Sequence, residues 1–330
     1  MDLTKQPPRR PTNLSMGGIL NLARMTDKAR AHNDETLGEY LYGKESGLDE
    51  SLLAFLEISE ENFADAAGRY GDAELVTWVQ EAAGKTAQEI EAFNEEWLAK
   101  EPKAEDGKQR LKDRIAKYAP DRTDITTVLK SIELEDWGLF KDVDLTGRAP
   151  RSPFGRDVGG IYGVARMADK GRAAKAGLNG EFNYDCPIDQ AILGFLGIGA
   201  DDFQEAACAN PNDTELGEWV LANTDRSRAE ISTFNAGMAV RGPETDDQKE
   251  FFNGLLVSIA PHRTDVKTWF DLIDLDDEIS FGTVDLTRHA ARSPYDTSVC
   301  GMVGLSRMAD KGWASIDGTL GDYWYGADSG

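Results

Sequence analysis

The chain has 330 residues, of which 40% are apolar and 29% charged, a composition typical of a folded, water-soluble protein with more than one domain. Its formal net charge of −23 excludes the basic surface that nucleic acid or an anionic membrane would require, so we expect neither as a partner of this acidic protein. No apolar run approaches the ~20 residues of a membrane span, and the N-terminus has no apolar signal segment, so we expect a cytoplasmic location.

The cysteine and histidine content bears on redox compartment and on metal binding. Cys186, Cys208 and Cys300 lie far apart without a Cys-x-x-Cys pair, which predicts reduced thiols in an intracellular protein. The chain has only 3 histidines, too few to favour a His/Cys metal cage. We therefore expect no metal ion and no cofactor.

An internal repeat organises the sequence. The segment GILNLARMTDKAR at Gly18–Arg30 matches GIYGVARMADKGR at Gly160–Arg172 at 8 of 13 positions, and GMVGLSRMADKGW follows at Gly301–Trp313. The later segment LDESLLAFLEISEENFADAA (48–67) likewise returns as IDQAILGFLGIGADDFQEAA (188–207). A repeat this long is a domain rather than a solenoid unit, so the sequence predicts tandem copies of one domain.

These matches divide the chain into two full copies and one partial copy. Residues 1–142 form the first copy and residues 143–283 the second, while residues 284–330 repeat only the early part. We call the early part of each copy segment A and the later part segment B. The apolar residues of the last segment A need cover, which predicts packing either on the second copy or on another chain in a homo-oligomer.

Each segment A is expected to contain one helix that follows a pair of small residues, Gly-Gly in the two full copies. At 100° per residue, Val164 and Met167 lie on one side of this helix in the second copy, and Arg166, Asp169 and Lys170 lie on the other. We therefore expect the methionine in the core and the charged trio on a separate face.

Segment B is predicted to be helical throughout. In the first copy Asp49 and Asp72 stand where N-caps are expected, Thr86-x-x-Glu89 is a capping box, and Thr123-Asp124 opens the last helix. The second-copy counterparts are Asp189, Asp213, Ser227-x-x-Glu230 and Thr264-Asp265. Charged stretches with Gly or Pro at 100–109 and 240–248 are predicted loops. The fold class is thus all-α, with short extended pieces only at the GEYLY-type segments.

The first chemical candidate is an anion site at the start of the segment A helix. An arginine precedes a proline upstream of each helix, and arginine binds carboxylate or phosphate in bidentate fashion. A glycine-initiated helix also presents free N–H groups to an anion. Alternatively, the arginines and aspartates simply tie the helix to its neighbours. The candidate ligand-binding residues are Arg9, Gly17, Gly18, Arg24, Asp27, Lys28, Glu39 and Tyr42; Arg151, Ser152, Gly159, Gly160, Arg166, Asp169, Lys170, Glu181 and Tyr184; and Arg292, Ser293, Arg307, Asp310, Lys311, Asp322 and Tyr325.

Two further arrangements could carry catalysis. Glu39 with Tyr42, and the matching pairs Glu181 with Tyr184 and Asp322 with Tyr325, could move protons, or the tyrosine could satisfy a buried carboxylate. Cys186 precedes a helix, where a thiol can become a nucleophile, although the first copy has no cysteine there. The sequence leaves open whether the protein is an enzyme.

The motifs in order resemble one known family. The string DLT…PRSP…GGI…ARMADKGRA…GEFNY…CPIDQAILGFLGI…APHRTDVKTWFDLIDLDD in the second copy resembles the DUF5069 family, and the first copy resembles it more loosely. The resemblance implies a bacterial, mainly helical domain, and the family name carries no activity. Two full copies with a partial third depart from the single-domain form of that family.

Two functions are therefore expected from the sequence. One is a binding protein or enzyme for a small anionic metabolite, with its pocket at the segment A helix. The other is a non-catalytic scaffold that uses the repeated segments A as docking surfaces.

Overall fold

The computed structural model describes residues 1–261, 263–281, 286–287, 290–291, 293–295, 302–316 and 318–326. These residues form fifteen α-helices and one 3-10 turn, and none of them lies in a β-strand. The prediction of an all-α fold is confirmed. The GEYLY-type segments form turns and irregular backbone instead of strands, and a short 3-10 helix follows the first of them.

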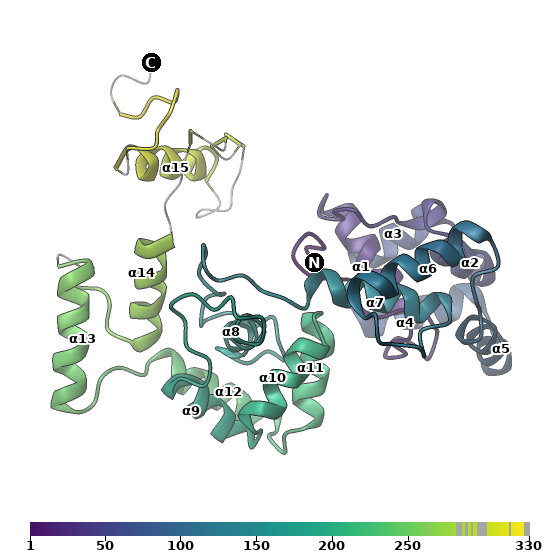
Figure 1. Ribbon diagram of the computed structural model, residues 1–330, viewed down its shortest axis with the longest axis horizontal. Helices are drawn as coiled ribbons and strands as arrows, with labels where there is room; N and C mark the ends of the chain where they lie inside the picture. The colour runs from purple at the N-terminus through teal and green to yellow at the C-terminus, as the bar shows by residue number, and fades with distance from the viewer. Residues whose placement is uncertain are drawn as a thin grey trace. The chain divides into compact units, whose positions relative to one another are not determined.

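The chain folds into two compact units, whose helices are labelled in Figure 1. The first unit comprises Met1–Asp144 and Arg156–Arg226, and the second comprises Leu145–Gly155 and Ser227–Gly330. The division therefore falls inside the second copy of the repeat.

The first unit contains the whole first copy and the first four helices of the second. Its elements are α1 (Leu22–Asn33), η1 (Gly43–Glu45), α2 (Gly47–Leu56), α3 (Glu60–Arg69), α4 (Asp72–Ala83), α5 (Ala87–Leu98), α6 (Glu105–Tyr118), α7 (Val128–Phe140), α8 (Val164–Ala176), α9 (Pro187–Leu196), α10 (Ala200–Ala209) and α11 (Asp213–Ala222). The second unit contains α12 (Arg228–Ala239), α13 (Asp246–Ile259), α14 (Trp269–Phe281) and α15 (Leu305–Ile316).

The core of the first copy forms around α1, which packs on α3, as α8 packs on α10 in the second copy. Leu22, Met25, Leu52 and Phe63 are completely buried in this core. Each such side chain stabilises the fold by about 1.5–3 kcal/mol relative to its exposed state. The predicted core position of the methionine is therefore observed in α1.

The charged face of α1 is buried as well. Arg24, Asp27 and Lys28 are 5%, 1% and 3% exposed, and the equivalent Arg166, Asp169 and Lys170 of α8 are also buried. Buried charges are costly unless they are paired. Packing against ion-pair partners thus covers a face that periodicity alone would leave in solvent.

The segment A helices begin later than their glycine pairs. Gly17 and Gly18 form a turn with φ of 64° and 70°, and α1 starts only at Leu22. The residue before α1, Asn21, has a left-handed φ of 65°, a conformation that glycine (Gly163 before α8) adopts at lower cost. The glycine pair is therefore not the helix N-terminus that an anion site would need.

Several predicted helix starts are wrong by one to four residues. Ser46 caps α2 and leaves Asp49 at its third position, Gly71 precedes α4, and Thr127 rather than Thr123 caps α7. The second copy shows the same shifts, with N-caps at Cys186 and Asn212 and α14 beginning at Trp269. Asp49 is drawn away from the capping role because it pairs with a buried lysine.

The capping boxes are confirmed. Glu89 N donates to Thr86 Oγ1 (3.3 Å) while Thr86 N donates to Glu89 Oε2 (2.8 Å), and Ser227 and Glu230 repeat the arrangement. The loops predicted at 100–109 and 240–248 are shorter than expected, because α6 and α13 begin within them.

Within the first unit, the N-terminal arm of the first copy binds the start of α11. Arg10 N donates to Glu215 Oε1 (2.9 Å), and Asn212 Nδ2 donates to the Pro7 carbonyl (2.8 Å). Trp137 of α7 donates to the Cys208 carbonyl of α10 (3.0 Å). The two copies are therefore joined by hydrogen bonds between residues 71 and 205 apart in sequence as well as through the connecting chain.

In the second unit, the described part of the last segment A has a small core of its own. Leu286, Ala291 and Ala314 pack together, and Leu286 N donates to the Thr319 carbonyl (2.9 Å). Met302, Val303 and Met308, expected to need cover, are 58%, 68% and 51% exposed in this structure. Two of the three histidines, His262 and His289, lie outside the described residues, as do Cys300 and Gly301.

Candidate anion-binding pocket

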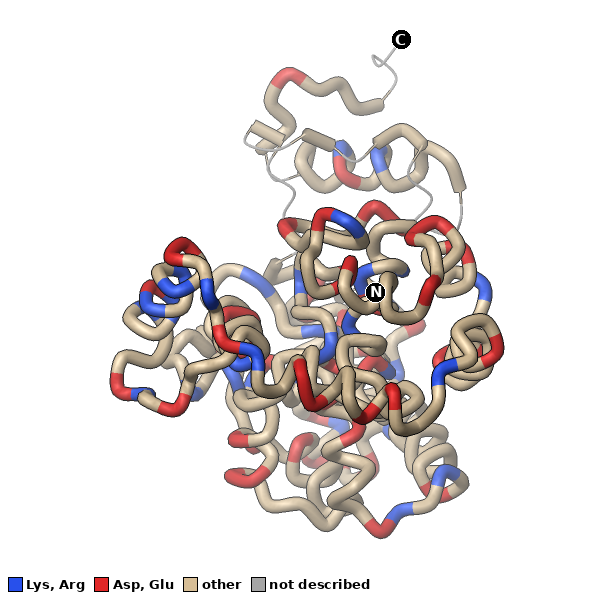
Figure 2. The backbone as a smooth tube through the Cα atoms, turned by 90° about the vertical axis from the view of Figure 1, so that its right-hand side faces the viewer, with Lys and Arg blue, Asp and Glu red and all other residues tan. Residues whose placement is uncertain are grey.

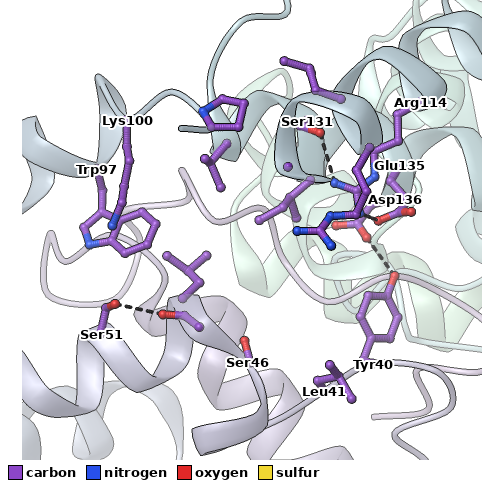
Figure 3. A pocket seen from close by; sticks show the side chains of 18 of the residues that line it. Tyr40, Leu41, Ser46, Ser51, Trp97, Lys100, Arg114, Ser131, Glu135 and Asp136 are labelled. Atoms are coloured by element: carbon purple, nitrogen blue, oxygen red, sulfur yellow. Dashed lines mark hydrogen bonds and ion pairs between the residues drawn. The ribbon is translucent and has the colours of Figure 1, made fainter. Parts of the chain in front are cut away.

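The charged face of α1 opens into a pocket of about 700 Å³ in the first copy. The pocket lies between the N-terminal half of α1, the segment around Tyr40 and Ser46, and helices α5 to α7 (Figure 3). Figure 3 shows Trp97 and Lys100 on one side and Arg114, Glu135, Asp136 and Tyr40 on the other. Three predicted residues, Arg24, Lys28 and Glu39, line this pocket.

Arg24 is held by a carboxylate from α7. Its Nη1 lies 2.6 Å from Asp136 Oδ2, and Tyr40 Oη donates to Asp136 Oδ1 (2.9 Å). Burial alone would lower the pKa of Arg24, but Asp136 outweighs burial and raises that pKa. Burial, followed by Asp136, raises the pKa of Tyr40. This side of the pocket is thus a compensated ion pair with a neutral phenol.

Lys28 donates to three acceptors behind the pocket wall. Its Nζ lies 2.6 Å from Asp49 Oδ2, 3.0 Å from the Leu41 carbonyl and 3.2 Å from Ser46 Oγ. Burial lowers the pKa of Lys28 to about 8, with Asp49 opposing that shift. Asp49 is held in turn by Asn21 Nδ2 at 3.0 Å. The single positive charge of Lys28 therefore already has a full set of partners.

The opposite rim carries positive charge that is less compensated. Lys100 Nζ lies 3.4 Å from the centre of the Trp97 ring, and Lys103 is exposed. Neither lysine has a carboxylate within ion-pair distance among the described residues. Arg110 pairs with Asp106 at 3.2 Å across an exposed helix turn, and Arg114 pairs with Glu135 and donates to Ser131 (3.0 Å). An incoming anion would meet unpaired positive charge here and not at α1.

Apolar side chains line the pocket between these charged sides. Leu48 and Trp97 belong to a buried cluster against which Val128 and Ile132 pack, and all four face the pocket. An apolar wall with a few polar groups at its margins is typical of small-molecule sites. The pocket is suited to an organic acid with an apolar body.

Arg9 does not reach this pocket. It is 2% exposed, its Nε and Nη2 donate to both oxygens of Asp27 (2.9 and 2.7 Å), and its Nη1 donates to Asp72 (2.7 Å). Burial alone would lower the pKa of Arg9, but Asp27 and then Asp72 outweigh it and raise that pKa. Arg9 and Asp27 thus tie the N-terminal arm to α1 and α4. This is the arrangement predicted as the alternative to an anion site.

Gly17 and Gly18 line a different hollow of about 760 Å³. Asn94 of α5 holds their turn by accepting from Leu20 N (2.9 Å) and donating to the Gly18 carbonyl (2.8 Å). The structure therefore disperses the predicted first-copy set: Arg24, Lys28 and Glu39 line the first pocket, Gly17 and Gly18 line the second, and Arg9, Asp27 and Tyr42 line neither.

Lys170 in the second copy has the same surroundings as Lys28. Its Nζ lies 2.7 Å from Asp189 Oδ2, 3.2 Å from the Asn183 carbonyl and 3.3 Å from Cys186 Sγ. The Arg166 guanidinium lies 5.5 Å from the centre of the Phe182 ring, as Arg24 lies over Tyr40 in the first copy. Cys186, a candidate nucleophile, thus occupies the position of the capping Ser46.

The proposed carboxylate–tyrosine pairs do not meet. Tyr42 Oη donates to the Glu60 carbonyl (3.2 Å) and Tyr184 Oη donates to the Ala200 carbonyl (2.6 Å), while Glu39 and Glu181 are exposed. Burial raises the pKa of both tyrosines. Both phenols therefore stay neutral and brace the start of α3 or α10.

The remaining predicted residues are dispersed. Ser152 Oγ donates to Asp274 (2.8 Å) in the second unit, and Arg307 donates to the Ala291 carbonyl (3.1 Å). Arg151 is half-buried and takes part in further interactions. In the last segment A, Asp310 is buried, Lys311 half-buried, and Ser293, Asp322 and Tyr325 exposed. Gly159 and Gly160 repeat the positive φ of the first-copy turn, at 63° and 74°. Arg292 lies outside the described residues.

Sequence reasoning missed the basic rim. Lys100 and Lys103 lie in the stretch 100–109 that was interpreted as a loop, Arg110 and Arg114 lie just beyond it, and only Lys100 has a basic counterpart in the second copy. The available signal was the alternation of basic residues with Trp97 and Leu111 across 97–114.

The family model named Domain of unknown function (DUF5069) matches residues 5–137 and again residues 147–279. The chain therefore belongs to the DUF5069 family and contains two tandem copies of its domain. No curated protein matches the sequence.

The described residues contain neither a membrane-spanning helix nor a cluster of metal ligands. Within that part of the chain, no helix combines the length and apolar character needed to cross a bilayer. Nor do three His, Cys, Asp or Glu side chains gather there in a way that could hold a metal ion. Acidic positions are spread along the described chain rather than gathered in one segment (Figure 2).

Proposed function

We propose that the protein binds a small organic anion in the pocket of its first copy. The observation that carries the proposal is the pair Lys100 and Lys103, whose charges have no carboxylate partner among the described residues, at the rim of a 700 Å³ hollow. The ion-paired Arg24 and Lys28 form a nearly neutral floor, so the charge that attracts the ligand comes from the rim.

The apolar wall favours a carboxylate on an apolar body over inorganic phosphate. Contact with Leu48, Val128 and Ile132 would remove apolar ligand surface from water. This favours the free energy of binding by roughly 25 cal/mol per Å². A bare phosphate would contact none of this surface productively. Binding or turnover of such an acid is therefore the proposed activity, with binding as its first step.

Thermal unfolding with acetate, benzoate, citrate and inorganic phosphate tests the proposal. A ligand at ~100 times its dissociation constant stabilises the folded state by ~2.7 kcal/mol. We expect benzoate to raise the melting temperature of the natural protein and not that of Lys100→Ala/Lys103→Ala. Lys112→Ala, on the exposed surface of α6, is the matched control. No shift with any anion, or an equal shift in the double variant, would refute the proposal.

A scaffold function has one observation in its favour. Met302, Val303, Met308 and Ile316 of the last segment A are more than half exposed. Exposed apolar side chains of this kind suit self-association. Size-exclusion chromatography with light scattering, across a concentration series, compares the oligomeric state of the natural protein with that of Val303→Glu/Met308→Glu. A monomer at every concentration would contradict self-association.

A further inference from the structure

The helices α6 and α7 supply the rim of the pocket, and α13 and α14 are their second-copy counterparts. Lys100 to Pro120 align with Arg241 to Pro261 without a gap, ending in the shared Ala-Pro. Both copies also keep one backbone bond at the start of the hairpin. Val128 N donates to the Lys100 carbonyl (2.8 Å), as Trp269 N donates to the Arg241 carbonyl (3.0 Å). Residue-by-residue comparison is therefore justified.

The basic character of the rim is confined to the first copy. Its four cations are Lys100, Lys103, Arg110 and Arg114. The corresponding residues of the second copy are Arg241, Glu244, Phe251 and Leu255. Arg241 and Glu244 cancel, so four positive charges become none.

The acidic residues beside the rim are kept. Asp106 and Glu135 of the first copy correspond to Asp247 and Asp276 of the second. The second-copy set is therefore acidic overall, and it would repel an anion that the first-copy set attracts.

Apolar surface replaces the arginines on α13. Phe251 is 65% exposed with its ring 6.4 Å from that of Trp269, and Leu255 packs against the small core formed by Phe252 and Leu272. Trp269 itself occupies the position of the pocket residue Val128. The substitutions thus change the chemistry of this hairpin from basic to apolar.

We infer that the chain has one anion site and not two, and that Lys103, Arg110 and Arg114 determine which copy carries it. The inference rests on the proposed function and adds the stoichiometry and the residues that set specificity. Arg110 can turn to a ligand because its pair with Asp106 is exposed on both sides, where ion pairs contribute little. Lys103 has no pair to give up.

An NMR titration of the full chain, read at the tryptophan indole N–H signals, tests the inference. Benzoate and inorganic phosphate are the probes, and the Trp97 and Trp269 signals are assigned with single Phe variants. Trp97 reports on the first-copy rim and Trp269 on the matched second-copy position. We expect benzoate to move the Trp97 signal to saturation while the Trp269 signal stays in place.

Charge reversal then tests the determinants. Lys103→Glu copies the second-copy residue and should weaken benzoate binding at Trp97 about fivefold or more, since two unit charges change beside the ligand. Lys112→Glu makes the same change in net charge on α6 outside the pocket and should leave binding within about twofold. Neither exposed side chain supports the fold, so both variants should unfold as the natural protein does.

The outcomes separate the two proposals. Equal movement of Trp97 and Trp269, or equal weakening by Lys103→Glu and Lys112→Glu, would overturn the single-site inference and leave anion binding standing. Silence at every indole with both probes would overturn anion binding itself.

Discussion

The two copies keep one region and change another. Around the segment A helix, Lys28 and Lys170 each have a carboxylate at the third position of the next helix, a backbone carbonyl and the side chain of an N-cap residue as partners. At the rim formed by the hairpin of α6 and α7, by contrast, three of the four basic residues become apolar or acidic in the second copy. The comparison teaches that the shared buried ion pairs form the framework of the domain, and that the unshared rim is where the copies can differ in function.

The largest effect should come from breaking the framework. In Asp27→Ala, Arg9 loses the partner of its Nε and Nη2 while remaining buried, which should cost about 3–5 kcal/mol of unfolding free energy. Urea unfolding measures this, with Arg122→Ala in the exposed Arg122–Asp124 pair as a control expected to leave stability nearly unchanged. A similar small effect for both variants would mean that the buried charges are not framework.

The next effect concerns Lys28 and pH. Its folded pKa of about 8 lies below the ordinary 10.5, so between these values the unfolded chain binds more protons than the folded chain. Stability should therefore rise with pH from about pH 8 to about pH 10, by up to about 3 kcal/mol. Below about pH 8 the lysine is charged in both states and adds no slope.

Lys28→Met is the variant that isolates this pH effect. It should lose stability overall, since Asp49 then lacks its cation, but it should also lose the rise above about pH 8. Urea unfolding at a series of pH values gives both quantities. The same slope in Lys28→Met would assign the titration to another group.

The smallest effect is at the N-cap, where the framework itself differs between copies. Cys186→Ser gives the second copy the cap of the first, and it should stabilise the protein by about 0.5–1 kcal/mol, because serine oxygen accepts helix N–H bonds better than sulfur. Ser46→Cys should lose a similar amount. Paired thermal unfolding curves test the exchange. Destabilisation by Cys186→Ser would show that the sulfur fills space that the smaller oxygen leaves empty.

Much of the fold was predictable because its signals are local or repeated. The duplicated RMxDK helix, the Thr86–Glu89 and Ser227–Glu230 boxes and the absence of strand alternation led to the all-α tandem repeat. The predicted start of α2 was wrong because aspartate is a residue type common at N-caps. Asp49 instead forms an ion pair with the buried Lys28.

The candidate site was less predictable because it depends on distant pairs. Arg24 is neutralised by Asp136, 112 residues away, and no local pattern announces that pairing. In addition, the internal repeat favours candidate residues at positions that both copies share. Lys100 corresponds to an arginine in the second copy and Lys103 to a glutamate, so neither residue is identical in the two copies. Their contribution became visible only with the pocket.

The bond between Arg10 and Glu215 has a consequence for how the chain is made. The donor leaves the ribosome 205 residues before its acceptor, so the arm of the first copy cannot reach its final place until α11 has been synthesised. If translation pauses before α11, the arm of the nascent chain has no binding site yet. The first copy therefore completes its folding only after α11 of the second copy has been synthesised. After the duplication, folding of the first copy depends on the second.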